Sequence, residues 1–304
     1  MTFIYFYLDK KTATRSHVGE LYKYIDYKYS MSVCAPSITS KKGNGTCYSR
    51  SALILIAKEY NKKYPDDKIT VAGKTKTQLF KEIKSHLSKQ CKQEWCWIDQ
   101  DFMNHNKAEK IAKATFRPKM PASWKNNKYE WLSTDDINSV MEQYEKLYPD
   151  FVFLGAVPID CPSLSFCQLH NFDVVKMYKN GIRQIGIIFN LDRHDQSGSH
   201  WTAFFIDLKK YMDVTYYDSY GQDASDEIKG FVSKVIKDIK KIPKLKDVIK
   251  YAYNTKRHQY GYSECGIYSQ HYIIQRLKGR SLKDVSSKKI PDKLMNQMRK
   301  YLYR

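Results

Sequence analysis

The stretch Ser199-His200-Trp201-Thr202-Ala203-Phe204-Phe205-Ile206-Asp207 is the most strand-like run of the chain and follows a polar loop. A second run of β-branched and aromatic residues, Val214-Thr215-Tyr216-Tyr217-Asp218, comes after a short turn and ends in an aspartate. If the two runs pair as a hairpin, the His200 imidazole and the Asp218 carboxylate meet at one end of a sheet. The pairing predicts both part of a sheet and part of a reactive site.

Further strand and helix patterns surround this predicted hairpin. Strand-like runs occupy residues 152–154, 184–190 and 249–254. Helical spacing of apolar residues predicts four helices in this part of the chain. The first has Thr134 as its expected N-cap and ends before Pro149, and the second begins near Ser225. The third begins at Cys265, and the last has Pro291 in its first turn. The sequence therefore predicts an α+β fold in which helices flank a single sheet.

The first part of the chain has a different character. Residues 51–60 and 79–87 have the apolar spacing of two short helices, which suggests a small helical module. The two prolines and polar residues of 117–129 are typical of a linker. We therefore expect a basic, mainly helical accessory domain at 1–120 and a second domain at 121–304.

The chain carries a formal net charge of +20, placed unevenly. Residues 1–128 hold 25 Lys and Arg against 11 Asp and Glu, and residues 129–304 hold 27 against 21. A basic excess of this kind favours DNA or another polyanion, but a solvated lysine-rich surface explains it equally well. No run approaches the length of a membrane span or of a signal sequence, so we expect a soluble, unsecreted protein with no membrane span.

Seven cysteines are scattered through the chain. Their odd number predicts no disulfide framework and suits a reducing compartment. A zinc site could involve Cys34, Cys47, Cys91 and Cys96, but the only short pair has C-x4-C spacing without a second pair. We expect no metal and at least one thiol available for chemistry.

Cys265 is the candidate nucleophile, because it begins a predicted helix, where unpaired amides and the helix dipole stabilise a thiolate. His200 is the candidate base, and Asp218 would orient its ring. Gln259, six residues before the cysteine, could donate to a developing oxyanion together with the Cys265 backbone amide. This set predicts a cysteine protease.

Each of these residues also has an ordinary structural explanation. A cysteine that opens a helix more often packs as a small apolar side chain, so the ordered combination carries the argument. Other histidines compete with His200 for the role of base, and the candidates are His170, His194, His258 and His271. His258, beside Gln259, is the second choice.

The residues His200-Trp201, Asp218 and the run Gln259-x5-Cys265-Gly266-Ile267-Tyr268 together resemble the ubiquitin-like-protein (SUMO) protease superfamily of cysteine peptidases. The stretch from Trp131 to Asn138 is similar to the opening of that family's domain, so the resemblance spans about residues 129–304. It looks closest to the branch of the African swine fever virus polyprotein-processing protease, which has asparagine at the position of Asp218. A source in a large DNA virus is therefore expected.

The resemblance implies a SUMO-protease/adenain-like core with a mixed central sheet. It also implies cleavage after Gly-Gly(-x), with Trp131 and Trp201 closing over a tunnel too narrow for side chains, although both tryptophans could simply pack in the core. Viral structural polyproteins would be the substrates during virion maturation, in the host cytoplasm at the viral assembly site and in the virion. No cofactor is expected.

Three alternatives stay open at this stage. Removal of SUMO- or ubiquitin-like modifiers would use every one of the same catalytic residues. Acetyl transfer by enzymes of similar fold would use a similar His, acid and Cys set, but the sequence has no recognisable coenzyme-binding signature. A non-catalytic nucleic-acid-binding role would rest on the basic N-terminal part, against the intact catalytic set.

Overall fold

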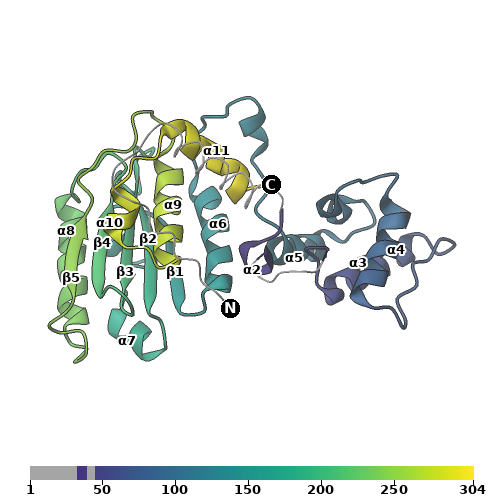
Figure 1. Ribbon diagram of the computed structural model, residues 1–304, viewed down its shortest axis with the longest axis horizontal. Helices are drawn as coiled ribbons and strands as arrows, with labels where there is room; N and C mark the ends of the chain where they lie inside the picture. Colours follow the sequence, from purple (N-terminus) through teal and green to yellow (C-terminus); the bar gives the residue numbers. More distant parts are fainter. Residues whose placement is uncertain (1–32, 40–44) are drawn as a thin grey trace, which may run out of the picture.

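The computed structural model describes residues 33–39 and 45–304. Within these ranges, no helix has both the length and the apolar composition to cross a membrane. A sheet with helices on both faces lies at one end of the molecule, and a smaller group of helices lies at the other (Figure 1). The α+β prediction is confirmed.

The sheet has five strands in the order β1-β2-β3-β4-β5. Their bounds are β1 (Phe151–Pro158), β2 (Gln184–Asn190), β3 (Trp201–Asp207), β4 (Asp213–Tyr217) and β5 (Lys250–Tyr253). The strands β2, β3 and β4 pair antiparallel, whereas β1 and β5 run parallel to their neighbours at the two edges. The hairpin expected from the two central runs is therefore present, within one mixed sheet.

Helices cover both faces of this sheet (Figure 1). One face carries α6 (Thr134–Leu147), α9 (Cys265–Leu277), α10 (Leu282–Ser286) and α11 (Asp292–Leu302), and the other carries α7 (Val174–Lys179) and α8 (Asp226–Ile239). Alternate side chains of β3 supply the two cores, since Ala203 and Phe205 pack under α9 and Phe204 and Ile206 pack under α8. Each buried Phe or Ile contributes about 2 kcal/mol.

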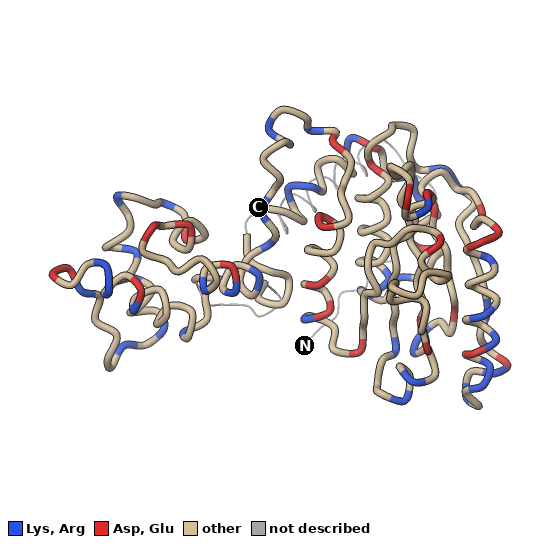
Figure 2. The backbone as a smooth tube through the Cα atoms, turned by 180° about the vertical axis from the view of Figure 1, so that it is seen from behind, with Lys and Arg blue, Asp and Glu red and all other residues tan. Residues whose placement is uncertain are grey.

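The smaller group of helices has its own apolar cluster, which extends as far as Phe116. It contains α3 (Arg50–Lys63), α4 (Lys76–Leu87), the 3-10 turn η1 (Glu94–Asp99) and α5 (His105–Thr115), whereas α2 (Pro36–Thr39) contacts α6. We call this group the helical module. Lys and Arg residues occur both here and around the sheet (Figure 2).

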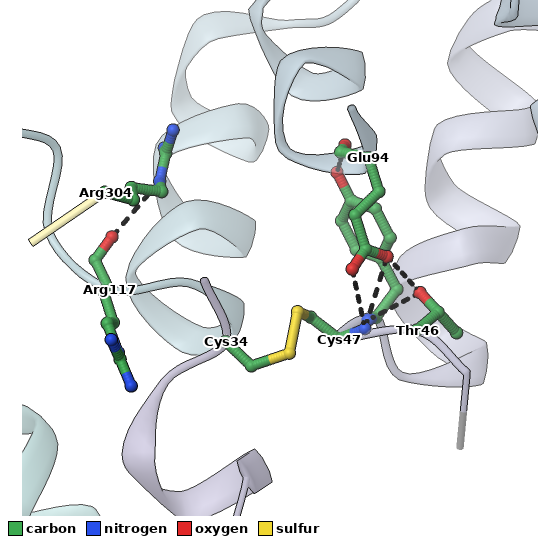
Figure 3. Close-up of a disulfide and its surroundings, with 7 residues drawn as sticks. Cys34, Thr46, Cys47, Glu94, Arg117 and Arg304 are labelled. Atoms are coloured by element: carbon green, nitrogen blue, oxygen red, sulfur yellow. Dashed lines mark hydrogen bonds between the residues drawn. A yellow bond between two sulfur atoms is a disulfide. The ribbon is translucent and has the colours of Figure 1, made fainter. Parts of the chain in front are cut away.

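Backbone hydrogen bonds tie the segment that follows the helical module to Arg304. The Arg304 amide donates to Pro118 O at 2.8 Å, and the Met120 amide donates to Arg304 O at 2.8 Å. The Arg304 guanidinium also donates to Arg117 O, beside the Cys34–Cys47 disulfide (Figure 3). The segment predicted as a linker further supplies Trp124, which is buried in the cluster of α6, α9 and α11. The division near residue 120 stays a prediction.

The cysteines pair in a way that the sequence did not indicate. The disulfides are Cys34–Cys47, Cys91–Cys96 and Cys161–Cys167, and Cys265 alone is free. The expectation of no disulfide framework is wrong, because the paired Cα atoms lie 5.2–6.1 Å apart, within bonding range. Such distances follow from tertiary packing and cannot be read from sequence spacing.

Candidate active site

The β3–β4 hairpin brings His200 and Asp218 together. His200 immediately precedes β3 and Asp218 immediately follows β4, so antiparallel pairing puts both at one sheet end. The imidazole Nε2 lies 2.6 Å from Asp218 Oδ1, and both side chains are buried. A hydrogen bond of this kind fixes the ring orientation and leaves Nδ1 for a second partner.

Cys265 supplies that second partner. It is the first residue of α9 and is buried, and it lies close enough to the His200 imidazole to influence the pKa of the ring. Burial alone would lower the pKa of His200, but the hydrogen bonds and charges of Asp218 and Cys265 outweigh it and raise the pKa to about 9. This environment favours the protonated imidazole, and the start of α9 presents unpaired backbone amides beside the sulfur.

Asp218 is itself held in place through both its backbone and its carboxylate. Asn254, just after β5, accepts from the Asp218 amide at 2.9 Å and donates to its carbonyl at 2.7 Å. The Tyr220 amide donates to Asp218 Oδ1 at 2.9 Å. Both partners fix the orientation of Asp218 toward His200.

Gln259 is buried on the loop that leads to α9. Its Oε1 accepts from Ser219 Oγ at 2.6 Å, and its Nε2 donates to Gly261 O at 2.9 Å. The Ser219 carbonyl also accepts from the Gln259 amide at 2.9 Å. One N–H of the side-chain amide therefore remains for another acceptor.

The two tryptophans occupy different environments. Trp131 precedes α6 and leaves 45% of its surface exposed, so it is open to a substrate chain. Trp201 is buried in the cluster of α6 and α9, and its indole donates to Leu132 O at 3.0 Å. Leu132 also packs directly on Gly266. The segment before α6 is thus fixed against the start of α9, and a shared tunnel role for the tryptophans stays a prediction.

The rival histidines lie in other environments. His258 uses both ring nitrogens, with Tyr217 Oη at 3.2 Å and Ser286 O at 3.0 Å, and burial lowers its pKa. His194 bonds to Asp160 at 2.7 Å, and burial lowers the pKa of His271 to about 3. His200 is therefore the histidine placed with both an acid and the free thiol.

Comparison with known proteins identifies the family. The catalytic domain of the Ulp1 protease family matches residues 183–304. R355 of Acanthamoeba polyphaga mimivirus, provisionally named a thiol protease, is 34% identical over 291 residues, which cover 90% of this chain and 94% of R355. The chain belongs to the Ulp1 protease family.

Other Ulp1-family proteins agree with this assignment. The SUMO-1 cysteine protease of African swine fever virus (isolate Pig/Kenya/KEN-50/1950) is 26% identical over 193 residues, which cover 57% of this chain and 67% of the viral protease. The crystal structure of the African swine fever virus protease shares the fold, with a TM-score of 0.61 and 22% identity over 90% of this chain and 96% of its own. The resemblance stated from the motifs is confirmed, and this Ulp1-family protein is a cysteine protease.

Sequence reasoning missed the residues that support the reactive groups. Ser219, Tyr220 and Asn254 hold Gln259 and Asp218 in place. The run Asp218-Ser219-Tyr220-Gly221 has the composition of a tight turn, which was the available signal. Asn254 could not be found from the sequence, because its contact with Asp218 depends on the pairing of β4 with β5.

Proposed function

We propose that this Ulp1-family protein is an endopeptidase that cleaves polypeptides after Gly-Gly(-x) with a His200, Asp218 and Cys265 triad. The observation that carries the proposal is the buried His200 ring, bonded to Asp218 at 2.6 Å and placed so that the free thiol at the start of α9 acts on its pKa. This arrangement has the nucleophile, base and orienting acid that acyl transfer through a thiol requires.

In the proposed reaction, His200 holds the proton of Cys265 and the thiolate attacks the glycyl carbonyl. The free N–H of Gln259 and the Cys265 amide donate to the oxyanion, a contribution of about 10²–10³ in rate for one donor. His200 then protonates the leaving amine, and water attacks the thioester with His200 as the base. The thiolate leaves, and the enzyme returns to its initial state.

Preference for glycine is supported by the close packing around the nucleophile. Gly266 lies against Leu132, whose carbonyl is bonded to Trp201, and the neighbouring Trp131 is exposed. We propose that Trp131 and Trp201 border a passage in which glycine fits and larger side chains do not. A panel of Gly-Gly-x peptides and matched Ala-Ala-x peptides tests this preference.

The first experiment compares cleavage of that panel by the wild-type protein, by Cys265→Ala and by His170→Gln. His170 is exposed and distant in sequence from the triad, so His170→Gln is the matched control. We expect cleavage by the wild type and the control and none by Cys265→Ala. Cleavage that persists in Cys265→Ala would contradict the proposed nucleophile.

We propose viral structural polyproteins as the substrate, processed during virion maturation in the host cytoplasm at the assembly site and in the virion, because the relatives described above are proteases of viruses. The name of the swine fever virus relative, a SUMO-1 cysteine protease, favours a second candidate, removal of a ubiquitin-like modifier. Incubation with a SUMO precursor and with capsid polyprotein fragments separates them. Detection of the protein in purified virions, by antibody, tests the location.

We also propose that DNA or another polyanion binds the helical module. Exposed lysines support this proposal, and they include Lys58, Lys68, Lys81, Lys84, Lys89 and Lys92. Binding by counterion release would weaken steeply with salt. Fluorescence anisotropy with labelled DNA from about 50 to 200 mM salt tests it, and salt-independent binding would contradict it.

A further inference from the structure

A cationic column stands beside the triad and has no part in the proposed reaction. We define the column as Arg257, Lys289, Tyr220 and Tyr260. The Tyr220 ring stacks on the His200 imidazole, with centroids 4.5 Å apart and 9° between the planes. The Arg257 guanidinium lies 4.9 Å from the Tyr220 ring and 4.8 Å from the Tyr260 ring, and the Lys289 ammonium lies 3.6 Å from Tyr260. The column thus runs from the imidazole to the surface.

The Arg257 guanidinium has a fixed orientation within the column. Its Nε donates to Gln259 O at 2.7 Å, and the two tyrosine rings lie beside it. The residue is exposed, and among residues 33–39 and 45–304 no acidic side chain forms an ion pair with it or with Lys289. A guanidinium held in this way offers its two terminal nitrogens as a fork that matches a carboxylate.

The carboxylates of this region are already engaged elsewhere. Asp218 bonds to His200, and Asp292 accepts from the amides of Tyr260 and Gly261 at 2.9 and 2.8 Å. Glu264 accepts from Ser263 Oγ at 2.9 Å. The positive charge of the column is therefore left for a partner outside the described chain, and that partner must be anionic.

We infer that the cationic column selects polypeptide substrates with an acidic residue close to the scissile bond, an inference that rests on the proposed endopeptidase function. The Tyr220 ring lies between the two groups, at 4.5 Å from the His200 imidazole and at 4.9 Å from the Arg257 guanidinium. An extended chain covers that span in about three residues at ~3.3 Å each. A substrate held at Cys265 for cleavage therefore brings side chains within about four residues of the scissile bond into reach of Arg257.

The test is a set of fluorogenic peptides with a central Gly-Gly-Ala and a single Asp placed in turn at each position up to four residues away. Each peptide is matched by one with Asn, which has the same shape without the charge. We expect Asp to raise kcat/KM about tenfold at one or two positions, mainly by lowering KM. The preference should fall severalfold near 1 M salt, because screening weakens exposed charge pairs.

Variants assign the effect to the column. Arg257→Gln and Lys289→Gln should each bring the Asp-to-Asn ratio toward one, and Arg257→Glu should reverse it in favour of a Lys peptide. Lys289→Gln leaves Arg257 and its bond to Gln259 in place, so it keeps the inference testable if the Arg257 variants disturb the loop. Lys234→Gln, on an exposed position of α8 that packs on the other face of the sheet, is the matched control and should keep the wild-type ratio.

The outcomes separate the inference from the function on which it rests. Equal cleavage of the Asp and Asn peptides by the wild type would overturn the inference and leave the proposed endopeptidase intact. An Asp preference retained by both Arg257→Gln and Lys289→Gln would also overturn it. Absence of cleavage of every peptide would overturn the proposed function and the inference with it.

Discussion

Neutralising Asp218 should change the pH range in which the enzyme works. The pKa of His200 is raised from 6.5 to about 9. At 1.36 kcal/mol per pKa unit, this difference favours the imidazolium by roughly 3 kcal/mol. Asp218 and Cys265 share the effect, so Asp218→Asn should remove about half of it and lower the pKa of His200 by about one.

The measurement is kcat/KM from pH 5 to 10 with a Gly-Gly-x peptide, together with the alkylation rate of Cys265, the single free thiol among the described residues. Because the imidazolium must be present in the active ion pair, the basic limb should move to lower pH by about one unit, and the rate should fall about twofold at pH 8 and about tenfold at pH 10. Asp223→Asn, in the same loop but bonded to Lys229 and Tyr251, is the control.

Asp218→Asn should also lower the free energy of unfolding, by an amount that depends on pH. A pKa raised in the folded state gives stability that is fully present below the unfolded pKa of 6.5 and is lost as the pH rises through about 9. Asp218→Asn should therefore lower the free energy of unfolding by about 1–2 kcal/mol at pH 6 and change it little above pH 10. An unmoved basic limb, or an equal shift in Asp223→Asn, would refute the reasoning.

Three other predictions concern the neighbourhood of the thiol. Gly266→Ala should lower the free energy of unfolding by about 1–3 kcal/mol, because its Cβ would meet Leu132 at 3.0 Å; Gly230→Ala, with open space around it, is the control and should not destabilise in thermal melts. Gln259→Ala should lower kcat about 10²–10³-fold with little change in KM, and an unchanged kcat would exclude an oxyanion role. Trp131→Ala should raise KM for Gly-Gly-x peptides severalfold and weaken the glycine preference, whereas an unchanged KM would remove Trp131 from the substrate path.

Local patterns were sufficient for the central sheet and for the helix that begins at Cys265. The continuous apolar run of β3 and the apolar spacing after Cys265 are strong, and the hairpin then requires His200 and Asp218 to meet. Gln259 was predicted by its distance from the cysteine, but not its bonds to Ser219 and Gly261. These bonds join loops distant in sequence, so no local pattern records them.

Other elements had too weak a signal. The helix α5 was not expected, because its sequence is mostly polar and only Ile111 and Thr115 are buried. The expected N-cap Thr134 is one residue late, since Ser133 caps α6 and completes a capping box with Asp136. Pro291 likewise lies at the N-cap of α11 rather than inside its first turn. Errors of one residue at helix ends arise because neighbouring polar residues cap almost equally well.

The distribution of the proposed triad along the chain has a consequence for biosynthesis. The β3–β4 hairpin leaves the ribosome well before α9, because α9 lies later in the chain. The segment at 118–120 is synthesised early, but its backbone partner Arg304 follows α11. A growing chain therefore contains His200 and Asp218 as an acid–base pair without a nucleophile in reach. The reactive thiol joins them only after α9 has emerged and packed on the sheet, so the nascent protein is inert toward its neighbours until that late step.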